Sequence, residues 1–145
     1  MNIFVRNVMF AFYLLVLLIL SGCAGLGPVY EKIEMVPQGK GLVYIYRPSN
    51  FIGGGSWYKV KVGETPITTL HNGGYYPYFS DPGKVEFWAK TETKSAVTLD
   101  IEANETYYVK GTIGMGLFLA RPDLSVVTNE IGSHEITGCK LISDK

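Results

Sequence analysis

The chain has 145 residues, and its 13 lysines and arginines balance 13 aspartates and glutamates. This length suits one ordinary domain and is too short for two domains with a linker. Because the formal charge is zero and no basic run exceeds a pair, the chain lacks the positive surface that nucleic acid demands. Aromatic residues make up 13% and charged residues 18%, which predicts a buried core rather than disorder.

An apolar segment follows a single positive charge near the N-terminus. Arg6 precedes Val8–Leu20, an unbroken apolar run of 13 residues. Such a run is typical of a secretory signal peptide and falls short of the roughly 18 residues that a membrane-spanning helix needs. We therefore expect residues 1–22 to form a signal-peptide helix that is cleaved off. The alternative is an uncleaved N-terminal anchor followed by a chance cysteine.

The residues that end this segment, Leu20-Ser21-Gly22-Cys23, resemble the bacterial lipobox. The resemblance implies cleavage before Cys23 and a diacylglycerol thioether on its sulfur, with acylation of the new amine. Two or three acyl chains anchor a protein to a membrane far more firmly than one. The implied protein is a membrane-anchored lipoprotein of the bacterial cell envelope. Ala24 stands where an aspartate would resemble the inner-membrane retention signal, which favours the outer membrane in a Gram-negative source.

The remaining cysteine and the histidines predict neither a disulfide nor a metal site. Cys139 has no partner, since a thioether-linked Cys23 cannot form a disulfide. His71 and His134 lie far apart in the sequence, whereas zinc needs about four ligands at close spacing. We expect no metal and no cofactor.

Residues 24–40 are rich in small residues and proline, and with Cys23 they predict a lipidated tether over 23–40. The tether could reach about 55–60 Å at roughly 3.3–3.6 Å per residue. Its apolar side chains can also pack on the outside of the domain, so we expect a flexible start and a docked end. These side chains are Val29, Tyr30, Ile33 and Met35.

From Gly41 to the last residue, 145, the pattern is that of β-strands separated by turns. Strands are expected at 42–46, 57–62, 66–70, 75–79, 84–90, 96–101, 106–113, 117–120 and 124–127. No segment is long enough for a crossover helix, and only Asn129–Ile136 can hold a short helix. This spacing is typical of antiparallel sandwiches. The fold is therefore expected to be mainly β, a small antiparallel β-sandwich of about seven to nine strands over 41–145.

Side-chain alternation predicts which residues fill the core. Leu42–Tyr46 is apolar on both faces and predicts a central strand, whereas Pro66 indicates an edge strand. In 84–90, Phe87 faces the core with its neighbours at 85 and 89, and Trp88 faces the other side. The Asn-Gly pair within His71–Gly74 predicts a hairpin turn.

Five segments in this order resemble the bacterial lipoproteins grouped as domain of unknown function 2846, over about residues 40–142. They are Gly41–Pro48 (GLVYIYRP), Val62–Glu64 (VGE), Leu70–Tyr75 (LHNGGY), Asp81–Val85 (DPGKV) and Thr106–Val109 (TYYV). A strand that ends in a Pro-Gly turn and re-enters an apolar strand is also similar to PEGA-type surface sandwiches. Neither resemblance implies catalytic residues.

Two further patterns contain residue types of catalytic or phosphate sites. Gly53–Ser56 is not followed by the Gly-Lys-Ser/Thr and helix of a phosphate loop, so it indicates an inter-strand loop. His71, Ser80 and Asp81 have the residue types of a triad, yet His71 lies in a turn without a nucleophile elbow. We therefore expect no catalytic residue and a non-enzymatic protein.

The aromatic residues are the strongest binding candidates, because their rings offer large stacking faces in carbohydrate or peptide grooves. A small sandwich also fills its core with such residues, and core packing is the favoured interpretation for the group as a whole. The expected exposed patch is Tyr75–Tyr78 beside the loop from Phe51 to Trp57. Its candidate binding residues are Phe51, Trp57, Tyr75, Tyr76 and Tyr78.

Two classes of function stay open. One is a non-enzymatic, lipid-anchored envelope protein whose sandwich binds a protein partner. The other is a carbohydrate- or peptidoglycan-binding module that uses the aromatic loops. Anionic glycans need a lysine or arginine near the stacking ring, and the candidates are Lys59, Lys61 and Arg47.

Overall fold

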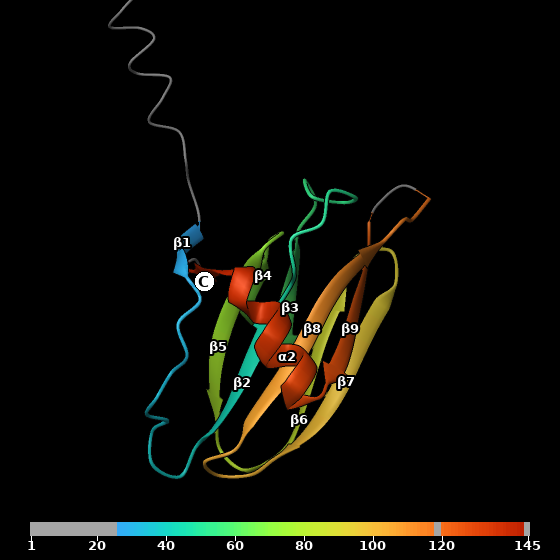
Figure 1. Ribbon diagram of the computed structural model, residues 1–145. Coiled ribbons are helices and arrows are strands. Elements are labelled where there is room, and N and C mark those ends of the chain that lie inside the picture. Colours follow the sequence, from blue (N-terminus) through green and yellow to red (C-terminus); the bar gives the residue numbers. More distant parts are fainter. Residues whose placement is uncertain (1–25, 118–119, 144–145) are drawn as a thin grey trace, which may run out of the picture.

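Two β-sheets pack face to face, and a short helix covers the outer face of one of them (Figure 1). The computed structural model describes residues 26–117 and 120–143. The strands in these ranges are β1 (Leu26–Val29), β2 (Gly41–Tyr46), β3 (Tyr58–Val62), β4 (Thr65–Leu70), β5 (Gly74–Ser80), β6 (Gly83–Lys90), β7 (Lys94–Ile101), β8 (Thr106–Gly114), β9 (Arg121–Val127) and β10 (Lys140–Ile142). The helical elements described are α2 (Asn129–Glu135) and the 3-10 turn η1 (Ile136–Gly138).

The six-stranded sheet has the order β1-β10-β5-β2-β8-β9, and the four-stranded sheet has the order β4-β3-β6-β7. The expected mainly β sandwich with a short C-terminal helix is confirmed, with ten strands in the described ranges. Two pairs in the larger sheet, β10–β5 and β2–β8, are parallel rather than antiparallel. Between β2 and β8 the chain passes twice through the four-stranded sheet, and it reaches β10 from β9 through α2 and η1.

The main core lies between the two sheets and is built from alternate residues of each strand. The expectation for β6 is confirmed, since Phe87 and Ala89 are fully buried and Val85 packs against them. In β3, Val60 is buried while Lys59 faces solvent. The period of two in the sequence therefore identifies the inward face of both strands.

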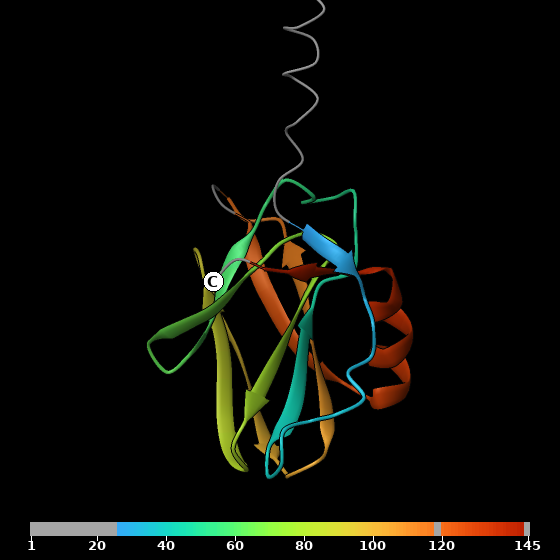
Figure 2. The ribbon, with the colours of Figure 1, turned by 90° about the vertical axis from the view of Figure 1, so that its left-hand side faces the viewer.

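A second apolar layer explains why β2 is buried along its whole length. Helix α2, η1 and the segment before β2 cover the outer face of the six-stranded sheet, as Figure 2 shows for the helix. The cluster beneath them consists of Leu42, Tyr44, Tyr46, Tyr75, Tyr108, Ile136 and Cys139. Because β2 is central and covered on both faces, its continuous apolar sequence has no solvent-facing positions.

The segment between β1 and β2 lies on the domain. The backbone N–H of Tyr30 donates to the carbonyl of Cys139 at 2.8 Å, and that of Ile33 donates to the Tyr44 hydroxyl at 2.9 Å. The docked end of the predicted tether is therefore present and reaches back to β1, although Val29 and Met35 are exposed. Residues 26–40 form part of the folded surface.

One turn and one strand boundary differ from expectation. The turn at 71–73 does not make a hairpin, because β4 and β5 belong to different sheets. The strand expected at 124–127 begins earlier, at Arg121, and includes Pro122 because β9 lies at the edge of the larger sheet. Local sequence marks where the chain bends, but pairing partners decide what the bend connects.

Candidate functional site

Lysines and tryptophans gather on the solvent side of the four-stranded sheet. We call this surface the tryptophan–lysine face; it consists of Trp57, Lys59, Lys61, Trp88, Lys90 and Lys94. The register of the strands brings them together, because Lys61 of β3 lies opposite Trp88 of β6, and Lys90 of β6 lies opposite Lys94 of β7. The face borders a groove of about 450 Å³ lined by Trp57, Tyr58, Lys59, Lys61, Trp88, Lys90 and Thr91.

Trp88 organises this face. Its indole N–H donates to the carbonyl of Gly63 at 2.7 Å, which fixes the ring against the β3–β4 turn. The ammonium nitrogens of Lys61 and Lys94 lie 4.8 and 5.0 Å from the ring centroid. Such cation–π contacts hold the two charges close to the sheet surface. The aromatic ring that remains open to a ligand is that of Trp57, which is 57% exposed.

The charge of the face is only partly balanced. Lys94 pairs with Glu86 at 3.1 Å, and Lys61 pairs loosely with Glu64 at 3.9 Å. Lys59 and Lys90 are exposed and form no ion pair with any described residue. Like charges directly opposite each other, such as Lys90 and Lys94, destabilise a sheet. The arrangement can therefore attract an anionic ligand and place it beside an exposed indole.

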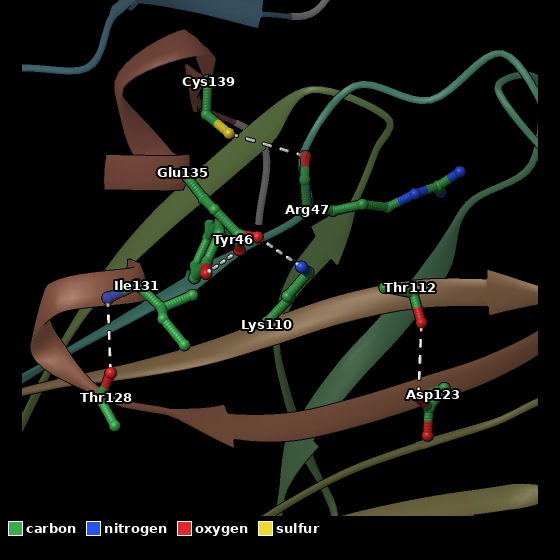
Figure 3. Close-up of polar contacts among 9 residues, drawn as sticks. All are labelled: Tyr46, Arg47, Lys110, Thr112, Asp123, Thr128, Ile131, Glu135 and Cys139. Carbon is green, nitrogen blue, oxygen red and sulfur yellow. Dashed lines mark hydrogen bonds and ion pairs between the residues drawn. The ribbon is translucent and has the colours of Figure 1, made fainter. Parts of the chain in front are cut away.

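A second polar group lies under α2 (Figure 3). The Tyr46 hydroxyl donates to Oε2 of Glu135, and Nζ of Lys110 donates to Oε1, both at 2.7 Å. The Lys110 hydrogen bond is the main reason that the pKa of Glu135 lies below its ordinary value. Burial, with the hydrogen bond to Glu135, raises the pKa of Tyr46. All these hydrogen-bonding groups satisfy one another, so the group fastens the helix to the sheet.

Cys139 adjoins this group from η1. Its thiol contacts the carbonyl of Arg47 at 3.6 Å, and burial raises its pKa to about 11. A buried protonated thiol is a poor nucleophile. The expected unpaired cysteine is present and serves as packing.

Arg47 is buried and shapes the long loop between β2 and β3. Its guanidinium donates to the carbonyls of Gly53 and Ser56, each at 2.7 Å. Burial lowers the pKa of this group from its ordinary value. Of the three cationic candidates from the sequence, Lys59 and Lys61 therefore lie on the tryptophan–lysine face, whereas Arg47 holds a loop.

The glycine-rich part of that loop does not form a phosphate cradle. The amide of Gly54 donates to the carbonyl of Phe51, and that of Ser56 donates to the carbonyl of Gly53. These bonds close turns within the loop, so neither amide points to a ligand. The interpretation as an inter-strand loop agrees with this geometry.

The predicted aromatic patch does not come together as one surface. Phe51 is fully exposed and Trp57 is partly exposed. Tyr75, in contrast, is buried beneath the N-terminal segment, with its ring 5.2 Å from that of Tyr30. An exposed position for Tyr75 is therefore wrong, because the outer face of its sheet is covered.

The other two tyrosines of the patch point to the opposite side of β5. Tyr76 and Tyr78 are each partly buried. The ring of Tyr78 meets that of Phe87 edge to face, with 5.5 Å between centroids, and packs on the core between the sheets. Alternation along one strand thus separates Tyr75 from its two neighbours.

The residue types of a triad do not assemble. His71 lies before β5, with its ring 6.3 Å from that of Trp57, and Ser80 ends the strand about 20 Å away. The Ser80 hydroxyl donates to the backbone carbonyl of Asp81, whose carboxylate pairs with Lys40 at 2.7 Å. No nucleophile and base meet among these three residues.

Sequence reasoning missed Lys90 and Lys94 as members of the face. The available signal was the alternation in β6, which places position 90 on the same side as Trp88. Lys94 joins them only through the β6–β7 hairpin, whose register no local pattern fixes.

Some predictions lie outside the described residues. The signal-peptide helix over 1–22 and the lipidated Cys23 are among them. In the described ranges, no helix is long and apolar enough to cross a membrane. Those ranges also hold no cluster of three or more histidine, cysteine or acidic side chains suited to a metal ion.

Comparison with known proteins identifies a family. A family model described as Protein of unknown function (DUF2846) matches residues 37–121, which include β2 to β8 and the whole tryptophan–lysine face. No curated protein and no solved structure matches the chain. Because the family match spans more than half of the chain, the protein belongs to the DUF2846 family.

Proposed function

We propose that the protein is a non-enzymatic, lipid-anchored binding protein of the bacterial cell envelope. The lipobox at Leu20–Cys23, after its 13-residue apolar run, supports the anchor. The separation of His71 from Ser80 and Asp81, and the protonated, buried Cys139, support a binding role over catalysis. In this proposal the sandwich binds the ligand.

The ligand class is an anionic glycan such as peptidoglycan, and the tryptophan–lysine face carries this assignment. Lys59 and Lys90 offer charge with no carboxylate partner among the described residues, and Trp57 offers a ring face to a sugar. A protein partner fits the face less well, because the cores of protein interfaces are depleted in lysine. The binding surface is thus the sheet face rather than the aromatic loops.

The anchor is tested with Cys23→Ala in the full-length precursor. Without the sulfur, no thioether can form and the precursor is not processed. The variant should keep its signal peptide and incorporate no labelled palmitate, whereas the unaltered chain incorporates it. Normal acylation of the variant would overturn the lipid anchor.

The ligand is tested by co-sedimentation of the mature lipidated chain, in detergent micelles, with purified peptidoglycan. A Lys59→Ala/Lys90→Ala double variant should bind about tenfold more weakly, which corresponds to about 1.4 kcal/mol. Trp57→Ala should weaken binding by a similar factor because the stacking ring is lost. Binding should also decline as salt rises from 0.05 to 0.5 M, with approximate Debye lengths near 14 and 4 Å.

Lys84→Ala is the matched control, since Lys84 is an exposed lysine at the other end of β6. It should bind like the unaltered chain. A neutral glycan such as chitin should not bind. Equal binding by the double variant and the control, or equal binding to chitin, would overturn the anionic-glycan assignment.

A further inference from the structure

Exposed apolar side chains gather at one end of the sandwich. Phe51 and Ile52 lie in the β2–β3 loop, and Met115 and Leu117 lie in the connection from β8 to β9. Phe51 is fully exposed, and the two β8–β9 residues are 85% and 83% exposed. The two loops adjoin each other across a hollow of about 210 Å³ bordered by Ile52 and Met115. We call these four side chains the apolar tip.

Hydrogen bonds hold both loops of the apolar tip in place. In the β2–β3 loop, the guanidinium of Arg47 donates to the carbonyls of Gly53 and Ser56. The backbone amide of Asn50, in the same loop, donates to the side-chain oxygen of Asn72 at 2.9 Å. On the other loop, the amide of Leu117 donates to Glu92 at 3.2 Å. Four exposed apolar side chains on two hydrogen-bonded loops form the kind of patch that marks an interaction site.

The first described strand starts at the same end. Leu26 of β1 pairs with β10, β10 pairs with the start of β5, and the turn before β5 contacts the β2–β3 loop through Asn72. Figures 1 and 2 show β1 and both apolar loops at the same end of the sandwich, with β1 and the β8–β9 connection on opposite sides of it in Figure 1. Cys23 precedes Leu26 by three residues, so the Cα atoms of these two residues are at most about 11 Å apart.

From these observations we propose that the apolar tip inserts into the interface of the membrane that holds the lipid anchor. The inference rests on the proposed acylation of Cys23. With so short a connection, an acylated Cys23 places this end of the sandwich, and not the opposite one, against the bilayer. Phe51, Ile52, Met115 and Leu117 then enter the boundary between headgroups and acyl chains.

The test places a fluorescent probe at the tip of the full mature chain. Phe51→Cys and Met115→Cys are labelled with nitrobenzoxadiazole, and Glu105→Cys is the control at the other end of β8, about 27 Å along the strand. All three positions are exposed, so the substitutions leave the core intact. Buried Cys139 stays in place, and the chain without an added cysteine measures background labelling.

The labelled chains are reconstituted into vesicles of phosphatidylethanolamine and phosphatidylglycerol. Probes at positions 51 and 115 should show blue-shifted emission and quenching by spin-labelled lipid, while the probe at 105 should be quenched by aqueous iodide. Iodide quenching at all three positions would overturn the inference. Protection from iodide without quenching by lipid would indicate that the tip contacts a second copy of the chain. That result would also overturn the inference.

Mass spectrometry of the N-terminal peptide separates this inference from the proposed function. An unmodified Cys23 would overturn the lipid anchor itself. An acylated Cys23 together with water-exposed probes at 51 and 115 would overturn only the orientation on the membrane.

Discussion

Phenylalanine occupies both extremes of exposure in this sandwich. Phe87 is completely enclosed between the sheets, with the ring of Tyr78 edge-on to it, whereas Phe51 projects fully into solvent. The same side chain therefore contributes most of its hydrophobic free energy to folding at one position and none at the other. Burial, and not residue type, decides the contribution.

Phe87→Ala is expected to destabilise the protein by about 3–5 kcal/mol, because it removes buried surface and leaves a cavity. This is a large share of the roughly 5–15 kcal/mol that holds a domain folded. A denaturant titration followed by circular dichroism measures the change. Phe51→Ala is the matched control and should stay within about 0.5 kcal/mol of the unaltered chain. Equal midpoints for the two variants would contradict the described core.

At the level of single residues, the sequence identified part of the candidate site. Trp57 and Lys59 could be selected because they share one side of the alternating segment 57–62. Tyr75 could not be excluded, since its burial depends on a segment more than 40 residues earlier that folds over it. Lys94 could not be included, since it joins the face through a neighbouring strand.

Helix α2 shows how an element is fixed by a few contacts. Thr128 caps it, with the side-chain oxygen accepting from the amide of Ile131, and Glu135 near its end is bound to the sheet by Tyr46 and Lys110. Gly132 faces Tyr108 of β8 so closely that a Cβ there would overlap the tyrosine Cβ, Cγ and Cδ1 atoms. The helix lies flat on the sheet because this position has no side chain.

Gly132→Ala tests that contact, because two effects have opposite signs. Alanine raises helix stability by about 0.8–1 kcal/mol relative to glycine. The overlap with Tyr108 should outweigh this gain, so the variant should unfold at a lower urea concentration by an equivalent of about 1–3 kcal/mol. Ser133→Ala, at the neighbouring exposed position, should be neutral or slightly stabilising. A stabilised Gly132→Ala variant would show that the helix does not approach the sheet this closely.

Glu135→Gln tests the ionic attachment of α2 through pH. The folded pKa of Glu135 is lower than that of an unfolded glutamate, about 4.3, so its contribution is present above that value and disappears as pH falls through the folded pKa. At pH 7 the variant should be about 1 kcal/mol less stable than the unaltered chain. The two chains should converge once the pH has fallen below the folded pKa of Glu135. A constant difference from pH 7 to pH 3, measured by urea unfolding, would contradict an ionised Glu135.

Element positions were largely predictable, whereas their connections were not. The strands around Phe87 and the helix after Thr128 follow from periodicity and capping. β1 and β10 were not predicted because they are short and pair only with each other and, for β10, with β5. The turn at 71–73 has hairpin chemistry, yet it joins different sheets, since its flanking strands find better partners elsewhere.

On the scale of the whole molecule, two surfaces meet near one end. The tryptophan–lysine face reaches the β6–β7 hairpin, and the hydroxyl of Thr91 in that hairpin donates to the carbonyl of Ala120 in the connection after β8. The apolar tip borders the same connection. A chain anchored at Cys23 and resting on its tip would present the tryptophan–lysine face beside the membrane, within reach of a glycan layer close to it.

Fractionation tests where that membrane is. Ala24 follows the lipidation site without the acidic residue of the retention signal, so in a Gram-negative host the mature protein should band with the outer membrane on a sucrose gradient. Ala24→Asp should shift it to the inner membrane, whereas Ala24→Ser should not. Recovery of the unaltered chain with the inner membrane would contradict the sorting prediction and leave the lipidation unaffected.

The pairing of β1 with β10 determines how this protein would carry mechanical load. If the membrane holds Cys23 and a glycan holds the sheet, tension enters the sandwich through β1, whose register with β10 runs only from Leu26↔Ile142 to Val29↔Lys140. Pulled from its first residue, this short strand would separate from β10 one hydrogen bond at a time, and the segment after it would then leave the outer cluster around Tyr75, before the core between the sheets is disturbed. Released and fully extended, residues 26–40 would form a connection of at most about 50 Å. The docked segment would thus act as an extensible linker, which lets the envelope layers move apart without unfolding the sandwich.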